Sequence, residues 1–180
     1  LIVQGRTIFA FGTLLIALLV MRKKIFFRDY REWLWLMLSG TILGVHWIAF
    51  FEAIQVSTVA IGLLSFASYP LFTTLLEPLF FKEVLKRKNL FAALIVICGL
   101  AMMATSSEDP STIISGSVLK GMLWGLGAGF GFAVLTLLNR VQVRNHSPLF
   151  LTFWQNGFAA AVLFAVFPLA IVAAAVPPGL

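Results

Sequence analysis

The chain has 180 residues, of which 61% are hydrophobic and only 11% are Asp, Glu, Lys or Arg. Soluble domains carry about 25% charged residues, so the charges present here cannot cover a water-facing surface of this size. Disorder is excluded as well, because disordered chains combine low hydrophobicity with high charge. The composition therefore predicts a protein whose solvent is mostly lipid.

The net charge of +6 raises the question of a nucleic-acid partner. The basic residues flank apolar runs, however, and this placement indicates membrane topology instead. We therefore expect no nucleic-acid partner. The single cysteine, Cys98, lies inside an apolar stretch and has no intrachain partner for a disulfide, so we expect its thiol to be buried.

Six apolar segments approach the length of about 20 residues that a spanning helix needs. They cover about 1–21, 33–54, 57–81, 89–106, 118–138 and 149–176. None alternates as barrel strands do, so all six are predicted to be helices. The basic run Arg22-Lys23-Lys24 follows the first segment, whereas a signal peptide carries its basic residues in front. The predicted fold class is all-α, a polytopic integral membrane helical bundle.

Basic residues alternate along the chain in a way that predicts orientation. Eleven of the thirteen Lys and Arg lie in three connections, at 22–32, 82–88 and 139–148. The other side of the membrane receives only Arg6 and Lys120, at the outer ends of their spans, and the 107–117 loop there is acidic and polar. Because Lys and Arg concentrate in cytoplasmic loops, 22–32, 82–88 and 139–148 are predicted to be cytoplasmic.

Several short stretches recur in a characteristic order and spacing. They are residues 5–10 (GRTIFA), 46–58 (HWIAFFEAIQVST), 69–72 (YPLF), 77–83 (EPLFFKE), 121–125 (GMLWG) and 146–148 (HSP). In this order the chain resembles the EamA family of the drug/metabolite transporter superfamily. The resemblance covers nearly the whole chain. It implies an integral protein of the bacterial inner membrane.

The resemblance also implies two homologous five-helix halves of opposite orientation, an inverted repeat. By that pattern, residues 1–107 form the first repeat without its first helix, 108–117 form the loop between repeats, and 118–180 begin the second repeat. We expect the chain to be a piece of a longer, ten-helix protein. The implied function is export of small organic metabolites such as amino acids, by alternating access with a cavity between the repeats.

Polar residues follow one side of the predicted span 57–81. At about 100° per residue, they fall within a stripe of roughly 80°. They are Thr58, Gly62, Ser65, Tyr69 and Thr73. Pro70 removes a backbone hydrogen bond and leaves a carbonyl near Phe66 without its helical donor. The stripe predicts a water-lined cavity with Ser65, Tyr69 and Thr73 as solute-binding candidates; the alternative is close helix packing.

Three ionisable residues in the spans are further candidates for binding solute, because such residues are costly in lipid. His46 lies near mid-span and could bind solute or a proton, or remain neutral and bond to a neighbouring helix. Glu52 could bind a cationic group or a coupling proton, or reach water at the outer interface. Glu77 could accept a proton or pair with Lys82.

Two further charges match the family pattern in structural roles. Arg6 opens the first span, and its side chain could snorkel to the headgroups or pair with Glu52. Glu83 matches the family's Glu at the cytoplasmic end of its helix, where we expect it to order the loop.

Glycines repeat every four residues along the span 118–138. Gly121, Gly125 and Gly129 have GxxxG spacing, which lets helix backbones approach closely in membranes. This ladder is also the basis of the competing hypothesis, a non-transport assembly protein that docks a partner through its glycine-rich helix.

No motif of a hydrolase, a zinc site or a phosphate-binding loop is present, and the two histidines, His46 and His146, are far apart in sequence. We therefore expect no enzyme activity, cofactor or metal. The expected partners are the lipid bilayer and a small organic solute, with a proton as candidate coupling ion. A second copy of the chain, forming a homodimer, is a further candidate partner.

Overall fold

The computed structural model describes residues 2–23, 25–26, 29–82 and 116–166, together with residues 88, 91, 92, 94–96, 98, 99 and 102. Glu83 and most of the predicted span 89–106 and of the 108–117 loop lie outside the described residues. The prediction that Cys98 is buried is wrong, because Cys98 is exposed. Because lipid surrounds the chain, an exposed thiol contacts an apolar solvent and not water.

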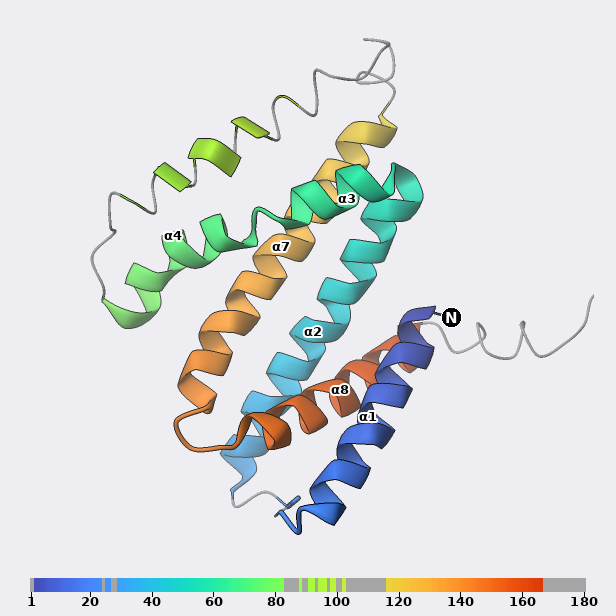
Figure 1. The fold of residues 1–180 in the computed structure, drawn as a ribbon, viewed down its shortest axis with the longest axis vertical. Coiled ribbons are helices and arrows are strands. Elements are labelled where there is room, and N and C mark those ends of the chain that lie inside the picture. The colour runs from blue at the N-terminus through green and yellow to red at the C-terminus, as the bar shows by residue number, and fades with distance from the viewer. Residues whose placement is uncertain are drawn as a thin grey trace, which may run out of the picture. The chain divides into compact units, whose positions relative to one another are not determined.

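The described elements are all helices (Figure 1). They are α1 (Ile2–Val20), α2 (Tyr30–Val56), α3 (Val59–Phe66), α4 (Tyr69–Phe81), α7 (Ser117–Gln142) and α8 (Pro148–Val166). No strand occurs within the described ranges. Four stretches there are long and apolar enough to cross a membrane: α2, α3 with α4, α7 and α8. The prediction of a polytopic helical membrane protein is confirmed.

The predicted span 57–81 is two helices in the structure, α3 and α4. Helix α3 begins after Thr58, whose Oγ1 accepts a hydrogen bond from the Ile61 backbone N–H at 3.2 Å. Such a cap satisfies one of the donors that a helix start leaves without a partner. Helix α3 ends at Phe66, and α4 begins at Tyr69.

Pro70 explains the position of this break. It lies in the first turn of α4, where its missing N–H leaves no helical hydrogen bond unmade. Between the helices, the Ser68 hydroxyl donates to the Ser65 carbonyl at 2.6 Å. The sequence predicted one helix with a carbonyl near Phe66 left without its helical donor; in the structure a new helix starts at Tyr69, one residue before the proline.

The chain divides into two compact units, residues 1–45 with 141–180, and residues 46–140. In the first unit, α1 packs along α8. The rings of Phe11 and Phe153 stack with centroids 4.5 Å apart, and the Gln4 amide donates to the Leu163 carbonyl at 3.3 Å. The core of this unit joins Leu36 on α2 to Phe150, Leu151, Trp154 and Phe158 on α8.

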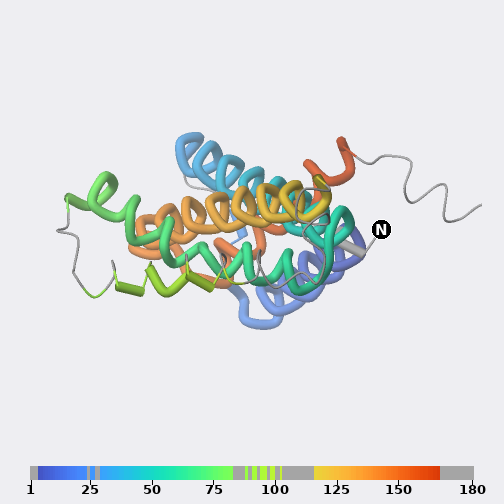
Figure 2. The backbone as a smooth tube through the Cα atoms, turned by 90° about the horizontal axis from the view of Figure 1, so that it is seen from above, coloured from blue at the N-terminus to red at the C-terminus, as the bar shows by residue number. Residues whose placement is uncertain are grey.

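The second unit holds the end of α2 from His46 onward, with α3, α4 and most of α7. Helix α7 runs alongside α3 and α4 (Figure 2). This unit contains the solute-binding candidates His46, Ser65, Tyr69 and Thr73.

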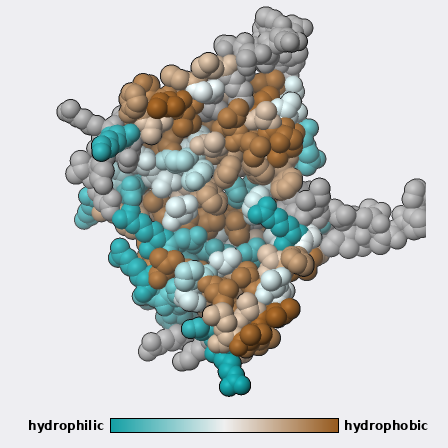
Figure 3. Space-filling view, in the orientation of Figure 1, coloured by the Kyte–Doolittle hydropathy of each residue, from teal (hydrophilic) through white to brown (hydrophobic). Residues whose placement is uncertain are grey.

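Large apolar side chains reach the surface, as brown areas over the visible face show (Figure 3). Phe9 is 78% exposed and Leu79 is 79% exposed. In water, apolar patches of this extent would cause association. In a bilayer the same side chains meet lipid, so this surface agrees with an integral membrane protein.

Candidate functional site

Three glycines of α7 lie against serines of α3 and of the connections on either side of it. Each of three glycines has a serine opposite it, and we call these pairs the glycine–serine seam: Gly121 with Ser57, Gly125 with Ser65, and Gly129 with Ser68. A Cβ added to Gly125 would lie 2.5 Å from the Ser65 Cβ, and one added to Gly129 would lie 2.9 Å from the Ser68 Oγ. Only glycine on α7 permits this approach.

The order of the seam gives the direction of the helices. Partner numbers rise together, from Ser57 opposite Gly121 to Ser68 opposite Gly129, so α3–α4 and α7 run parallel. The predicted topology requires this, because spans 57–81 and 118–138 both run from the outer side to the cytoplasm. The seam also occupies the glycine ladder within the chain, which leaves these three glycines unavailable for docking a partner.

Polar groups gather where α3 gives way to α4. The Phe66 carbonyl lacks a helical donor because residue 70 is proline, and its oxygen lies 3.1 Å from the Cβ position of Gly129. Ser65 is fully buried, and its hydroxyl has no hydrogen-bond partner among the described residues. A buried hydroxyl without a partner costs about 1–3 kcal/mol. The break therefore has a buried hydroxyl, that of Ser65, without a hydrogen-bond partner among the described residues.

His46 reaches α7 from α2. Its Nδ1 lies 2.9 Å from the Ala128 carbonyl oxygen, and the side chain is 3% exposed. A carbonyl can only accept, so Nδ1 is the protonated nitrogen in this contact. The ring lies 5.3 Å from Phe66 and 5.2 Å from Phe132, centroid to centroid. This hydrogen bond to a neighbouring helix is one of the two roles expected for His46. The other role, solute binding, stays a prediction.

Tyr69 contacts the same two aromatic rings. Its centroid is 5.5 Å from that of Phe66 and 5.1 Å from that of Phe132. The Thr73 hydroxyl donates to the Tyr69 carbonyl at 2.9 Å, one turn further along α4. Tyr69 and Thr73 are half-buried, whereas Ser65 is buried. The structure thus brings His46 and Tyr69 together around an aromatic cluster, with the seam beside them.

Glu77 pairs with Arg140 of α7 and not with Lys82. The Arg140 guanidinium carbon also lies 4.3 Å above the centroid of the Phe81 ring. Lys82 instead ends α4 in the left-handed conformation, at φ 53°, while its backbone N–H donates to the Pro78 carbonyl. Arg140 lies 63 residues away in sequence, so local spacing could not identify it.

The remaining charged candidates, Glu52 and Arg6, belong to different units of the chain. Glu52 is half-buried and makes no hydrogen bond or ion pair with any residue in the described ranges. Arg6 is exposed and belongs to the other unit of the chain. Their pairing remains a prediction, and so does a role for Glu52 in binding a cation or a proton.

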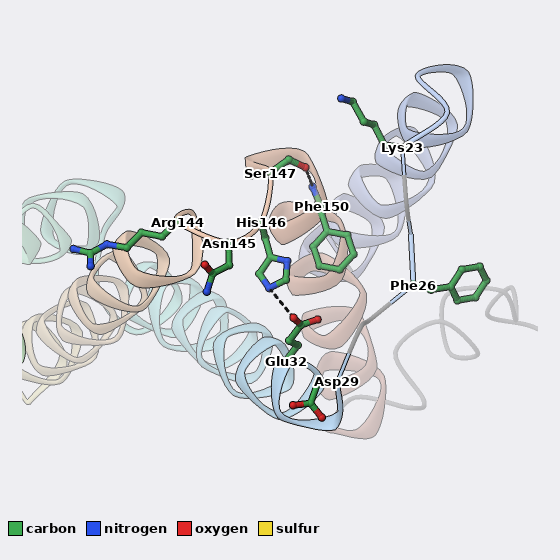
Figure 4. A pocket seen from close by; sticks show the side chains of 9 residues that line it. All are labelled: Lys23, Phe26, Asp29, Glu32, Arg144, Asn145, His146, Ser147 and Phe150. Atoms are coloured by element: carbon green, nitrogen blue, oxygen red, sulfur yellow. Dashed lines mark hydrogen bonds and ion pairs between the residues drawn. The ribbon is translucent and has the colours of Figure 1, made fainter.

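A recess of about 1010 Å³ opens in the first unit, where two connecting loops meet (Figure 4). The His146 imidazole faces the Glu32 carboxylate, with Nε2 and Oε1 3.9 Å apart, and stacks on Phe150 at 5.1 Å. The Lys23 and Arg144 side chains point away from this contact. The recess is lined by Lys23, Phe26, Asp29, Glu32, Arg144, Asn145, His146, Ser147 and Phe150.

Sequence reasoning missed this recess, because it treated the loops at 22–32 and 139–148 only as markers of topology. One local signal was available. Ser147 precedes Pro148 at the start of α8, and its hydroxyl accepts from the Phe150 N–H at 3.3 Å, which is a recognisable helix cap. No comparable sequence pattern predicts that the Glu32 carboxylate lies close to the His146 imidazole.

A second contact missed by sequence reasoning joins α2 to the end of α7. The Gln142 amide lies 3.3 Å from the Ser39 hydroxyl and 3.4 Å from the Trp35 carbonyl. Gln142 is buried, so its amide acts as polar glue between helices in an apolar surrounding. Across the described part of the chain, no group of three or more His, Cys, Asp or Glu side chains is placed to hold a metal ion.

Composition, helix lengths and the apolar surface define an integral membrane protein of the polytopic helical class. Residues 2–105, more than half of the chain, match the EamA-like transporter family. The chain belongs to this family.

Two curated relatives carry the word transporter in their names. The chain is 27% identical over 133 residues to the uncharacterized transporter YxxF of Bacillus subtilis (strain 168), covering 74% of this chain and 42% of that protein. It is 25% identical over 158 residues to an uncharacterized transporter of Helicobacter pylori (strain J99), covering 87% of this chain and 52% of that protein. The chain thus spans about half the length of these relatives. No solved structure matches it.

Proposed function

We propose that this chain forms part of a transporter for small organic metabolites such as amino acids, which works by alternating access between two inverted repeats. Residues 1–107 would belong to the first repeat and residues 118–180 to the second. The loops 22–32, 82–88 and 139–148 would face the cytoplasm. A proton is the proposed coupling ion, and a homodimer is the proposed assembly.

One observation carries this proposal: a membrane-spanning segment is broken at Ala67–Ser68, with polar groups beside the break. In lipid, irregular backbone is tolerated only where protein or a water-filled cavity satisfies it. Transporters use such broken helices near the bilayer midplane to hold solutes and ions. We therefore assign Tyr69, Thr73 and the buried Ser65 hydroxyl to one side of the solute path, with His46 beside it.

The competing hypothesis is an assembly protein that docks a partner through the glycine ladder. Gly121, Gly125 and Gly129 already face Ser57, Ser65 and Ser68 of the same chain. A partner helix would have to displace these contacts before it could use the ladder. This occupancy favours transport over docking.

The flux test uses the full-length protein reconstituted in phospholipid vesicles. Uptake is measured for a panel of amino acids and related metabolites, with and without a pH gradient, against protein-free vesicles. We expect protein-dependent flux of at least one solute, and acceleration by the pH gradient if a proton is coupled. Absence of any protein-dependent flux across the panel would contradict the proposed function.

Cysteine labelling tests the solute path directly. In a Cys98→Ala background, Tyr69→Cys and Thr73→Cys are expected to react faster with a water-soluble maleimide than Leu64→Cys, which replaces an exposed apolar residue. Ser65→Cys is expected to be the slowest of the path positions, because Ser65 is buried against Gly125. If Tyr69→Cys and Thr73→Cys react no faster than Leu64→Cys, no water reaches this side of α4.

A further inference from the structure

Helix α4 is tied to the end of α7 by a charge and an aromatic ring. Glu77 and Phe81 lie four residues apart and therefore share one face of α4. Arg140, in the last turn of α7, places its guanidinium against the Glu77 carboxylate and over the Phe81 ring at 4.3 Å. Its positive charge also suits the carboxyl end of α7, where the helix dipole is negative.

The other end of the same helix pair is held differently. At the glycine–serine seam the backbones touch, since the Gly125 Cβ position lies 3.3 Å from the Gly62 carbonyl oxygen and that of Gly129 lies 3.1 Å from the Phe66 carbonyl oxygen. No flexible side chain separates the helices there. Backbone contact at one end and side-chain contact at the other favour a pivot at the seam over sliding of one helix along the other.

The break in the spanning segment lies at the Ser68 end of the seam, on the side toward the Glu77–Arg140 contact. Ala67 and Ser68 belong to neither α3 nor α4, and the Phe66 carbonyl makes no helical bond to residue 70, which is proline. Helix interiors resist bending because each residue is held by the i to i+4 ladder. At this break the ladder is interrupted, so α4 can change its angle to α7 while α3 stays on the seam.

The ion pair is placed where it can open. The Arg140 side chain is 41% exposed and that of Glu77 is 28% exposed. Separating a fully buried ion pair leaves two unpaired charges in an apolar surrounding. In a partly exposed pair, water replaces each partner, and the free-energy cost of separation is much smaller. The contact therefore holds α4 against α7 without locking it.

We propose that Glu77, Arg140 and Phe81 form a latch at the predicted cytoplasmic end of α4 and α7. When the latch opens, α4 tilts at the Ala67–Ser68 break and exposes Thr73 and Tyr69 to the cytoplasm. This inference rests on the proposed transport function. It makes Glu77 and Arg140 positioning residues that control access to the path, distinct from groups that bind solute or a proton.

The experiment measures access to Thr73→Cys in the full-length protein in vesicles, in a background in which Cys98 and every other native cysteine are replaced by alanine. An impermeant maleimide is applied from the side on which Asn145→Cys, made separately, is labelled, because Asn145 lies in the same loop region as the latch. Glu77→Gln and Arg140→Gln are expected to accelerate Thr73→Cys labelling by about threefold to tenfold, through loss of the ion pair and of the cation–π contact. The exchange of both charges, Glu77→Arg with Arg140→Glu, is expected to return the rate toward that of the parent.

Lys82→Gln is the matched control, because it removes a neighbouring charge outside the latch and is expected to leave the rate unchanged. Phe81→Leu removes the ring while keeping apolar volume, and is expected to accelerate labelling by about twofold to fivefold. If Glu77→Gln fails to fold, the labelling rate of the Phe81→Leu variant tests the latch in its place. Parental rates in Arg140→Gln and Phe81→Leu would overturn the latch, as would a double exchange that stays as fast as the single changes.

The two proposals fail separately. Faster labelling without flux of any solute would leave the latch standing and reject transport. Flux with unchanged labelling in the latch variants would leave transport standing and reject the latch.

Discussion

Gly125→Val is expected to lower the free energy of unfolding by about 1–3 kcal/mol, the usual cost of forcing extra atoms into a packed interface. The Cβ of the new side chain would lie 2.5 Å from the Ser65 Cβ, and its two methyl groups would extend further. The obstructing atom is the first carbon of Ser65, which moves only with its backbone. Helix α7 would therefore have to separate from α3.

Gly127→Val is the matched control for this prediction, because it makes the same chemical change two residues along the same helix. Nothing lies within 4 Å of a Cβ at Gly127, and valine is a slightly better helix former than glycine. We expect its unfolding midpoint to equal or exceed that of the parent. The measurement is thermal or detergent-induced unfolding followed by tryptophan fluorescence. Equal loss of stability in both variants would show that the seam does not exist.

His46→Ala is expected to lower the free energy of unfolding by about 2–4 kcal/mol, by analogy with large-to-small changes in cores. The imidazole fills space between Phe66, Phe132 and Trp47, with ring centroids 5.0 to 5.3 Å away. Its removal leaves a cavity in the aromatic cluster. It also removes the hydrogen bond from Nδ1 to the Ala128 carbonyl.

His46→Phe separates packing from polar chemistry at the same position. It keeps a ring in the cluster but loses the hydrogen bond, so we expect a cost of about 1 kcal/mol. If His46 binds solute or a proton, flux in His46→Phe vesicles falls much further than the amount of folded protein does. If flux follows the amount of folded protein, His46 is only an interhelical contact. Unfolding curves and solute uptake are measured on the same preparations, so that the two roles of His46 can be distinguished.

Much of the fold could be predicted from the sequence because lipid imposes a simple rule. Backbone groups must be satisfied within each span, so long apolar runs become helices. The observed helices α2, α7 and α8 correspond to the predicted spans 33–54, 118–138 and 149–176. Most of their ends agree within a few residues. Helix α8 is described only to Val166, so the predicted end of its span lies outside the described residues. The glycine spacing likewise predicted close approach by α7, and the partners it approaches are Ser57, Ser65 and Ser68.

What could not be predicted depends on which residues meet across large distances in the chain. The spacing of Glu77 and Lys82 suggested a local pair, but Arg140 lies on the adjacent helix and takes that place. The break at Ala67–Ser68 lies inside the single predicted span 57–81, because Pro70 within an apolar run fits either one irregular helix or the start of a new one. The Thr58 cap and the Ser68 hydrogen bond distinguish the two, and both are local contacts between residues three apart in the sequence.

The connection between α2 and α3 has a consequence for how the protein enters the membrane. Only Ser57 and Thr58 separate the two helices, the Ser57 hydroxyl donates to the Ala53 carbonyl at 2.5 Å, and Thr58 caps α3. The turn therefore carries hydroxyls already satisfied by its own chain and no charged loop to be drawn across lipid. Helices α2 and α3–α4 can thus insert together as one helical hairpin during synthesis, before α7 packs against Ser57, Ser65 and Ser68.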